Sequence, residues 1–238
     1  MTPVALWLAS HFAYQATQAK RPSKPKRIAH RGAAAYAPEN TLEACLHGIR
    51  LGADYLEVDV RQAGDGKLVL MHDSSLRRTT GRSGRVETSD SQGLPTFDQF
   101  LQLASQHRIG IFPEIKGHGI EEAMVQAIHA HGLQARTIIP AFSSQALHKV
   151  HQLDPQIPLC QLLYPWELLL RKPQKGVTIV APMAEGLLLS PWIVRQAHRR
   201  GLKVWPWFAG LENAFTVRFL RSLGVDGLIV NDPAFRDS

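Results

Sequence analysis

The chain is poor in cysteine, with 2 in 238 residues. Cys45 and Cys160 lie far apart and in no Cys-x-x-Cys spacing, which argues against a disulfide scaffold and against a cysteine-ligated zinc site. We therefore expect both to be reduced thiols, as is usual for a protein of the cytoplasm.

Long hydrophobic runs are also missing. The first 19 residues contain no Asp, Glu, Lys or Arg, but Ser10, His11 and Gln15 interrupt their apolar pattern. A membrane-spanning helix needs about 20 apolar residues. A signal peptide carries its positive charge before the apolar run, whereas here the basic residues follow it. We expect residues 1–27 to comprise a helix that packs on the domain and, after it, a basic linker that ends at residue 27. Weak contact of this segment with a membrane surface is the alternative.

Acidic residues are outnumbered by basic ones, so the formal net charge is +7 and the pI about 9.7. A basic surface suits nucleic acid, anionic membranes or phosphorylated substrates. No nucleic-acid-binding motif accompanies the charge, so we expect no nucleic-acid partner.

From residue 28 onward, short apolar segments alternate with amphipathic ones. Buried-type strands are expected near residues 28, 57, 112, 139, 160, 179, 204 and 228, with helices over 39–52, 96–107, 119–132, 144–154, 191–201 and 213–224. This alternation predicts parallel strands with helices on both faces of the sheet. Eight such units indicate an α/β protein with a closed (β/α)8 barrel over residues 28–238. An open, doubly wound sheet is the alternative, but no Gly-x-Gly-x-x-Gly follows the first strand.

An insertion follows the second strand. The turn signal Gly64-Asp65-Gly66 predicts a hairpin over residues 58–73. Residues 74–93 contain few apolar anchors, so we expect a loop there, with Arg77 and Arg78 in solvent; substrate binding by these two residues is the alternative.

Charged and polar side chains stand where the expected strands end, and the active site of such a barrel lies at those ends. They are His30, Arg31, Glu57, Asp59, His72, Glu114 and Lys116. Residues i and i+2 of a strand share a face, which places Glu57 with Asp59 and Glu114 with Lys116. Three buried carboxylates are costly unless a cation neutralises them. All-oxygen ligands favour Mg²⁺, Ca²⁺ or Mn²⁺.

The remaining side chains suit the cleavage of a phosphodiester. His30 and His72 can act as general acid and general base, while Arg31 and Lys116 can bind a phosphate. Each pair alone has a plainer interpretation, such as a surface salt bridge worth about 0–1 kcal/mol. Their ordered occurrence at successive strand ends favours a catalytic site.

Ordered segments carry a family resemblance: AHRG…APENT, GADYLEVDV, DGKLVLMHD, LRRTTGRSGRV, PEIK, GLKVWPW and GVDGLIVNDP. This set, from Ile28 to Pro233, resembles the glycerophosphodiester phosphodiesterases. The resemblance implies a TIM barrel that hydrolyses glycerophosphodiesters to sn-glycerol 3-phosphate and an alcohol. In that family the substrate's own glycerol hydroxyl attacks phosphorus, and water then opens a cyclic phosphate.

The resemblance also implies roles for individual residues. His30 and His72 would be the catalytic pair, and Arg31 and Lys116 would face the phosphate. The metal ligands would be Glu57, Asp59 and Glu114, with Mg²⁺ or Ca²⁺ as cofactor and Mn²⁺ as a further candidate. Residues 74–96 match the family's insertion, which is expected to cap the mouth of the barrel.

One segment departs from the family pattern. The family usually has Trp-Thr-Val-Asn where this chain has Trp207-Phe208-Ala209-Gly210. Trp207 is retained and is expected to bind substrate, but the choice of substrate stays open. Small polar diesters such as glycerophosphocholine are our first choice. The alternative is a lysophospholipase D acting on membrane lysophospholipids, favoured by the apolar residues Trp166 and Leu168–Leu170 near the expected mouth.

A third hypothesis is a catalytically inactive barrel that only binds phosphate. The presence of every acid, base and ligand position argues against it. The sequence leaves the oligomeric state open.

Overall fold

The computed structural model describes residues 24–164, 167 and 173–234. The helix expected near the amino terminus and residues 20–23 of the basic linker lie outside these residues, as do Trp166 and Leu168–Leu170. Lys26 and Arg27, the end of that linker, belong to the first strand. Among the described residues, no helix is both long and apolar enough to span a bilayer.

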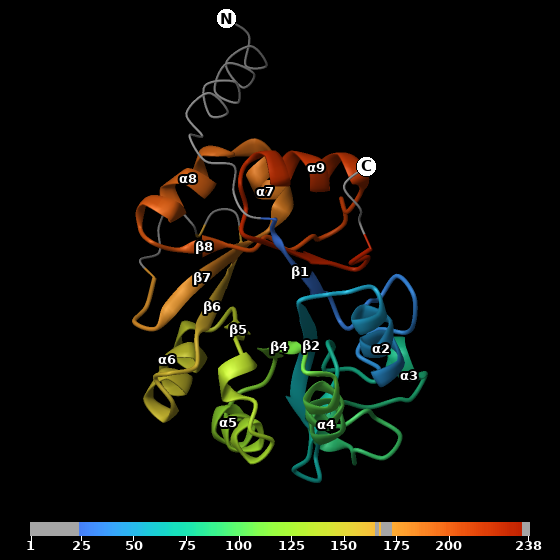
Figure 1. Ribbon diagram of the computed structural model, residues 1–238. Helices are drawn as coiled ribbons and strands as arrows, with labels where there is room; N and C mark the ends of the chain where they lie inside the picture. Colours follow the sequence, from blue (N-terminus) through green and yellow to red (C-terminus); the bar gives the residue numbers. More distant parts are fainter. Residues whose placement is uncertain (1–23, 165–166, 168–172, 235–238) are drawn as a thin grey trace, which may run out of the picture.

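Parallel strands form the predicted closed barrel, with helices outside it (Figure 1). The barrel strands are β1 (Lys26–Ala29), β2 (Tyr55–Gln62), β4 (Gly110–Ile115), β5 (Ile139–Ala141), β6 (Leu159–Leu163), β7 (Val177–Pro182), β8 (Lys203–Val204) and β9 (Gly227–Val230). They pair in the orders β9-β1-β2-β4 and β5-β6-β7-β8. Parallel bridges between Ile111 and Thr137 and between Trp207 and Ile229 join the two sheets and close the barrel.

The predicted helices are all present among the described residues. They are α2 (Leu42–Arg50), α4 (Phe97–His107), α5 (Glu121–Ala130), α6 (Ser144–Leu153), α8 (Trp192–Arg199) and α9 (Ala214–Ser222). The amino termini of α2, α4 and α9 are capped by the side chains of Thr41, Thr96 and Asn213. The helix α7 (Ala184–Leu189) was not expected, because its six residues are too few to show a helical period.

The insertion contains more structure than expected. Strand β3 (Leu68–Leu70) pairs antiparallel with β2 and confirms the hairpin. The expectation of a plain loop over 74–93 is wrong in part, because α3 (Arg77–Thr80) and the 3₁₀ turn η1 (Val86–Thr88) lie there. A small core anchors them: Ala63, Val69, Met71, Leu76, Val86 and Leu94. These apolar residues are too widely spaced to give a periodic signal.

Strand alternation decides which side chains face the barrel interior. Leu56, Val58 and Val60 belong to the core between strands and helices, so Glu57 and Asp59 point the other way, into the barrel. Strand β2 continues to Gln62 to pair with β3, so Asp59 lies within the strand rather than at its end.

The same alternation orients the side chains of β4 and of Cys160 in β6. Phe112 joins the interior core with Cys160, and Glu114 follows two residues later on the same face. The register of β2 and β4 pairs Asp59 with Glu114, which brings their carboxylates to one level of the barrel. Both cysteines are buried and free, as expected, and burial raises the pKa of each thiol.

Candidate active site

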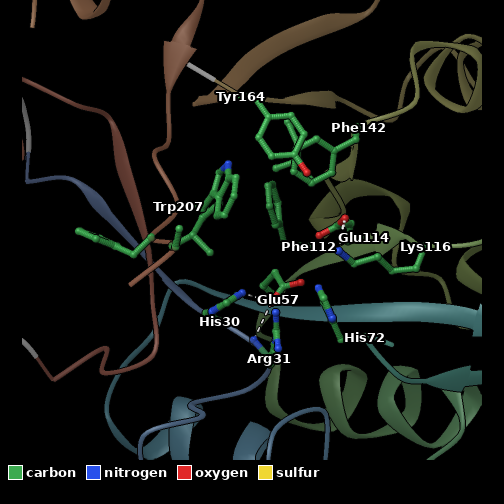
Figure 2. A pocket seen from close by; sticks show the side chains of 14 residues that line it. His30, Arg31, Glu57, His72, Phe112, Glu114, Lys116, Phe142, Tyr164 and Trp207 are labelled. Atoms are coloured by element: carbon green, nitrogen blue, oxygen red, sulfur yellow. Dashed lines mark hydrogen bonds and ion pairs between the residues drawn. The ribbon is translucent and has the colours of Figure 1, made fainter. Parts of the chain in front are cut away.

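A cavity of about 450 Å³ opens at the carboxyl ends of the strands, and the predicted residues meet there. Figure 2 shows charged side chains on one side of it and aromatic rings on the other. The charged and polar lining comprises His30, Arg31, Glu57, His72, Glu114 and Lys116. Asp59 lies beneath them, almost fully buried.

The three predicted acidic residues form one cluster. Each of the three carboxylates offers an oxygen atom that lies within 4.8 Å of the oxygens of the other two. The residues are Glu57, Asp59 and Glu114, and all three are buried. Burial and the charges of its two neighbours raise the pKa of Glu57 well above its usual range. Burial also raises the pKa of Glu114, to about 7, although Lys116 opposes it. The pKa of Asp59 is lowered, because burial is outweighed by Lys116 and other nearby positive groups.

These residues fit a hard divalent cation. Glu57 Oε2 accepts a hydrogen bond from the backbone N–H of Arg31 at 2.6 Å, but its Oε1 is buried without a partner. A buried carboxylate oxygen without a partner is costly, and a cation would supply one. The oxygen-only donor set suits Mg²⁺, Ca²⁺ or Mn²⁺.

Asn40 holds one of these carboxylates in place. Its Nδ2 donates to Asp59 Oδ2 at 2.8 Å, and its Oδ1 accepts the backbone N–H of Asp59 at 2.9 Å. Sequence reasoning missed this role, although Asn40 stands in the Pro-Glu-Asn-Thr segment that carries the family resemblance.

The two predicted cations lie beside the acidic cluster. Lys116 Nζ is 2.7 Å from Glu114 Oε1 and 3.3 Å from Asp59 Oδ1, and the charges of Glu114 and Asp59 raise its pKa against the effect of burial. Arg31 Nη1 donates to Glu39 Oε1 at 2.9 Å, and its Nε is 3.5 Å from Asp59 Oδ2. Both cations are largely buried, yet both line the cavity.

His30 follows β1 directly and lies at the edge of the cluster. Its Nε2 is 3.9 Å from Glu57 Oε2, and its Nδ1 is 2.9 Å from Asn231 Oδ1. Burial, and next the charge of Arg31, lower the pKa of His30 to about 4. The ring is therefore neutral near pH 7.

His72 follows the hairpin and lies on the same side of the cavity as His30, with Glu57 between them (Figure 2). Its Nδ1 is 2.7 Å from Asp73 Oδ1, and Asp73 Oδ2 accepts from Arg78 Nε at 2.5 Å. Burial lowers the pKa of His72 even though Asp59 and Asp73 act in the other direction. A carboxylate partner on Nδ1 nevertheless distinguishes this imidazole from His30, whose partner is a neutral amide.

Arg78 is exposed, as expected, with 48% of its side chain accessible, but it also forms ion pairs that were not expected. It donates to both carboxylate oxygens of Glu39, at 2.8 and 2.7 Å, as well as to Asp73. Because Glu39 also accepts from Arg31, one network runs from Arg31 to His72. Among the described residues, none from 74–96 lines the cavity, so the expected cap over the mouth is not found. The insertion contributes instead through Arg78, which contacts Asp73, the partner of His72.

The other side of the cavity is aromatic. The rings of Phe142 and Tyr164 stack with centroids 5.0 Å apart, and Trp207 meets Phe142 edge-on at 5.9 Å. Lys116 Nζ lies 5.8 Å from the centroid of Phe142, so the aromatic wall adjoins the charged side. Trp207 was predicted to bind substrate and does line the cavity.

The segment that departs from the family pattern forms part of this wall. Phe208 and Ala209 line the cavity next to Trp207. The backbone N–H groups of Ala209, Gly210 and Leu211 donate to the carboxylate of Glu185 at 2.9–3.2 Å. This contact fixes the segment against α7, the helix that was not predicted.

Comparison with known proteins identifies a family for the chain. The model of the glycerophosphoryl diester phosphodiesterase family matches residues 30–114 and 109–235. A glycerophosphodiester phosphodiesterase of Caldanaerobacter subterraneus subsp. tengcongensis is 30% identical over 234 residues, which cover 87% of this chain and 93% of the relative. One from Bacillus subtilis is 28% identical over 253 residues, covering 89% and 85%.

Solved structures share the barrel. A glycerophosphodiester phosphodiesterase of Agrobacterium tumefaciens superposes with a TM-score of 0.76 at 24% identity, covering 89% of this chain and 99% of that one. An Oleispira antarctica phosphodiesterase in complex with the product sn-glycerol-3-phosphate gives 0.78 at 24% identity, covering 88% and 94%. The chain therefore belongs to the glycerophosphodiester phosphodiesterase family, whose members are phosphoric diester hydrolases.

Proposed function

We propose that this enzyme hydrolyses glycerophosphodiesters to sn-glycerol 3-phosphate and an alcohol with the help of a divalent cation. The observation that carries the proposal is the convergence of three buried carboxylates, with oxygens within 4.8 Å of one another, in a cavity lined by His30 and His72. Neither a phosphate-binding barrel without catalysis nor a simple salt-bridge network explains why two imidazoles adjoin that cluster.

Each charged residue has a role in this proposal. Glu57, Asp59 and Glu114 would hold Mg²⁺ or Ca²⁺, with Mn²⁺ as a further candidate. When bound, the cation would supply Lewis-acid stabilisation of the phosphate oxygens. Arg31 and Lys116 would bind the same phosphate and stabilise the negative charge that develops on it.

The two histidines would move protons in two steps. Nε2 of His30 takes the proton of the attacking glycerol hydroxyl while the new P–O bond forms, and His72 gives a proton to the oxygen of the leaving alcohol as its bond to phosphorus breaks, which leaves a cyclic phosphate. In the second step His72, now neutral, deprotonates water, which attacks phosphorus and opens the cyclic phosphate. His30 then returns its proton to the glycerol oxygen, so both residues end as they began. His72 is assigned as the first acid because the Asp73 carboxylate stabilises its protonated form.

The aromatic wall would receive the alcohol portion of the substrate. Trp207 with Phe142 and Tyr164 could bind a choline cation over their ring faces, an interaction worth about 0.5–2 kcal/mol. The same wall favours the second candidate, a lysophospholipase D, because an acyl chain also suits apolar rings. A cavity of about 450 Å³ suits a small diester better than a long chain, so glycerophosphocholine and glycerophosphoethanolamine remain our first choice.

A substrate panel tests both candidates. We expect phosphorus NMR to detect sn-glycerol 3-phosphate from glycerophosphocholine and glycerophosphoethanolamine in the presence of Mg²⁺, Ca²⁺ or Mn²⁺. Lysophosphatidylcholine, assayed with and without detergent, should turn over more slowly. Equal or faster turnover of the lysophospholipid would make the second candidate the correct one. Absence of turnover with every cation and every diester would contradict the proposed function.

Cation binding should strengthen as the pH rises from 6 to 8. In the cation-free protein the pKa of Glu114 is about 7 and that of Glu57 is also raised, so protons compete with the cation below pH 7. Each displaced proton strengthens binding by up to about tenfold per pH unit until the group is ionised. Titration calorimetry in two buffers of different ionisation enthalpy measures both the affinity and the protons released. An affinity independent of pH, with no proton release, would show that these carboxylates are not the ligands.

Two further predictions extend beyond the described residues. We propose that the barrel domain begins with β1 at Lys26 rather than at residue 28, because Lys26 and Arg27 pair with β9, and that the segment before it is a separate unit that packs on the domain. Weak contact with a membrane surface is the alternative, and a location in the cytoplasm remains a prediction from the sequence.

A further inference from the structure

Two polar residues stand behind His30 on the side away from the cavity. Asn231, which directly follows β9, places its Oδ1 2.9 Å from His30 Nδ1. Its Nδ2 donates to Glu212 Oε2 at 2.7 Å. Glu212 also accepts the backbone N–H groups of Asn231, at 2.9 Å, and of Asp232, at 3.0 Å. The three side chains form a line from Glu212 through Asn231 to His30.

The hydrogen bonds of these three side chains determine which atoms carry protons. Burial raises the pKa of Glu212, but its Oε2 accepts two N–H donors and its Oε1 a third, so Oε2, the oxygen that faces the Asn231 amide, has no lone pair left for a proton. An ionised carboxylate only accepts, so the amide nitrogen of Asn231 must face Glu212 and its oxygen must face His30. That oxygen accepts in turn, and therefore Nδ1 of His30 carries the proton. Nε2, on the side of Glu57, keeps its lone pair.

We propose that Glu212 and Asn231 are positioning residues that hold His30 in the Nδ1–H tautomer and direct its Nε2 at the attacking hydroxyl. This inference rests on the proposed function, because it presumes that His30 is the general base. The line also connects three parts of the barrel: Glu212 stands between β8 and α9, Asn231 after β9 and His30 after β1.

A purely structural role is the competing explanation. The backbone N–H groups of Asn231 and Asp232 already tie the chain after β9 to Glu212 without the help of the Asn231 side chain. The contact between the Asn231 amide and the imidazole adds nothing to that tether. It does decide the tautomer, and in Ser-His-Asp hydrolases a wrong histidine tautomer lowers kcat by about 10⁴-fold.

Substitutions of Asn231 separate the two explanations. Asn231→Leu removes the acceptor and should lower kcat by about 100-fold or more, with KM for glycerophosphocholine changed by less than about threefold. Asn231→Asp should also lower kcat, because a second carboxylate then faces Glu212.

Asn213→Ala provides the matched control. Asn213 is the residue directly after Glu212 and caps α9. Its side chain accepts the backbone N–H of Thr216 at 3.1 Å and makes no hydrogen bond to His30. Its replacement should lower the thermal midpoint and leave kcat unchanged. An equal loss of kcat in Asn213→Ala and Asn231→Leu would overturn the inference in favour of loop integrity.

The tautomer can be measured without turnover. Long-range ¹H–¹⁵N spectra of histidine-labelled protein report which ring nitrogen carries the proton, and His30→Gln assigns the signal. We expect a protonated Nδ1 and an unprotonated Nε2 in the wild type, and a mixture in Asn231→Leu. An unchanged tautomer together with an unchanged kcat in Asn231→Leu would refute the inference. If the wild type holds this tautomer but hydrolyses no diester, the proposed function fails and the assignment of the His30 proton stands.

Discussion

Replacing His30 or His72 by alanine is expected to lower turnover by about 10²–10⁴-fold, the range typical of general acid–base catalysis, while the divalent cation stays bound. Neither imidazole belongs to the carboxylate cluster, which consists of Glu57, Asp59 and Glu114. The loss should therefore fall on kcat, and cation affinity measured by calorimetry should change little.

The leaving group distinguishes the two histidines. A glycerophosphodiester of p-nitrophenol has a leaving oxygen that needs no proton, so His72→Ala should recover much of its lost rate of p-nitrophenol release with this substrate, whereas the opening of the cyclic phosphate, for which His72 is the base, should stay slow. His30→Ala should lose a similar factor with both substrates, because deprotonation of the attacking hydroxyl is still required. The reverse pattern would exchange the roles that we assign. His107→Ala, an exposed histidine at the end of α4, serves as the control and should match the wild type.

The barrel and the centre of its site were predictable because both depend on short-range periodicity. Strands buried on both faces are short apolar runs, and their alternation with helices leaves few topologies. Within β2, Val58 belongs to the core between strands and helices. Because neighbouring residues of a strand face opposite sides, Glu57 and Asp59 must point into the barrel. The site at the strand ends then follows from the architecture of the barrel.

The supporting polar residues were not predictable, because their partners are distant in the sequence and they stand in loops. Asn231 contacts His30 across 201 positions, and Arg78 contacts Glu39 across 39. A polar side chain in a loop has no period and is read as solvated by default. Arg78 is the clearest example: only the folding of the insertion around its small core brings it to Glu39 and Asp73.

The aromatic wall illustrates a different limit. Phe142 and Tyr164 directly follow β5 and β6, where an apolar side chain fits either the barrel core or the cavity. Composition cannot separate these two environments, since burial against a helix and exposure to a substrate both favour aromatic residues. For the same reason Trp205 and Trp207 look alike in sequence, yet Trp205 packs inside the barrel against Phe112, with centroids 5.5 Å apart.

Replacing Glu57 by alanine is expected to abolish activity through loss of the cation itself. Residues that only support a metal ligand typically contribute 10- to 100-fold in affinity, so removal of a ligand should weaken binding by at least about 100-fold. Calorimetry with Mg²⁺ and Ca²⁺, or the electron paramagnetic resonance of Mn²⁺, measures this directly. Retention of both cation and activity in Glu57→Ala would show that the ligand assignment is wrong.

The thermal stability of Glu57→Ala should depend on whether a cation is present, because ionised Glu57 destabilises the cation-free protein. Without a cation, Glu57 is held beside two other buried carboxylates, and their charges together with burial raise its pKa. A raised pKa means that the folded state binds this proton more tightly than the unfolded chain, so ionisation of Glu57 destabilises the fold as the pH rises. In chelator at pH 8, Glu57→Ala should therefore lose less thermal stability than its lost packing predicts. On addition of Mg²⁺ the melting temperature of the wild type should rise and that of Glu57→Ala should not. Glu43→Ala, which removes an exposed carboxylate from α2, should follow the wild type in both conditions.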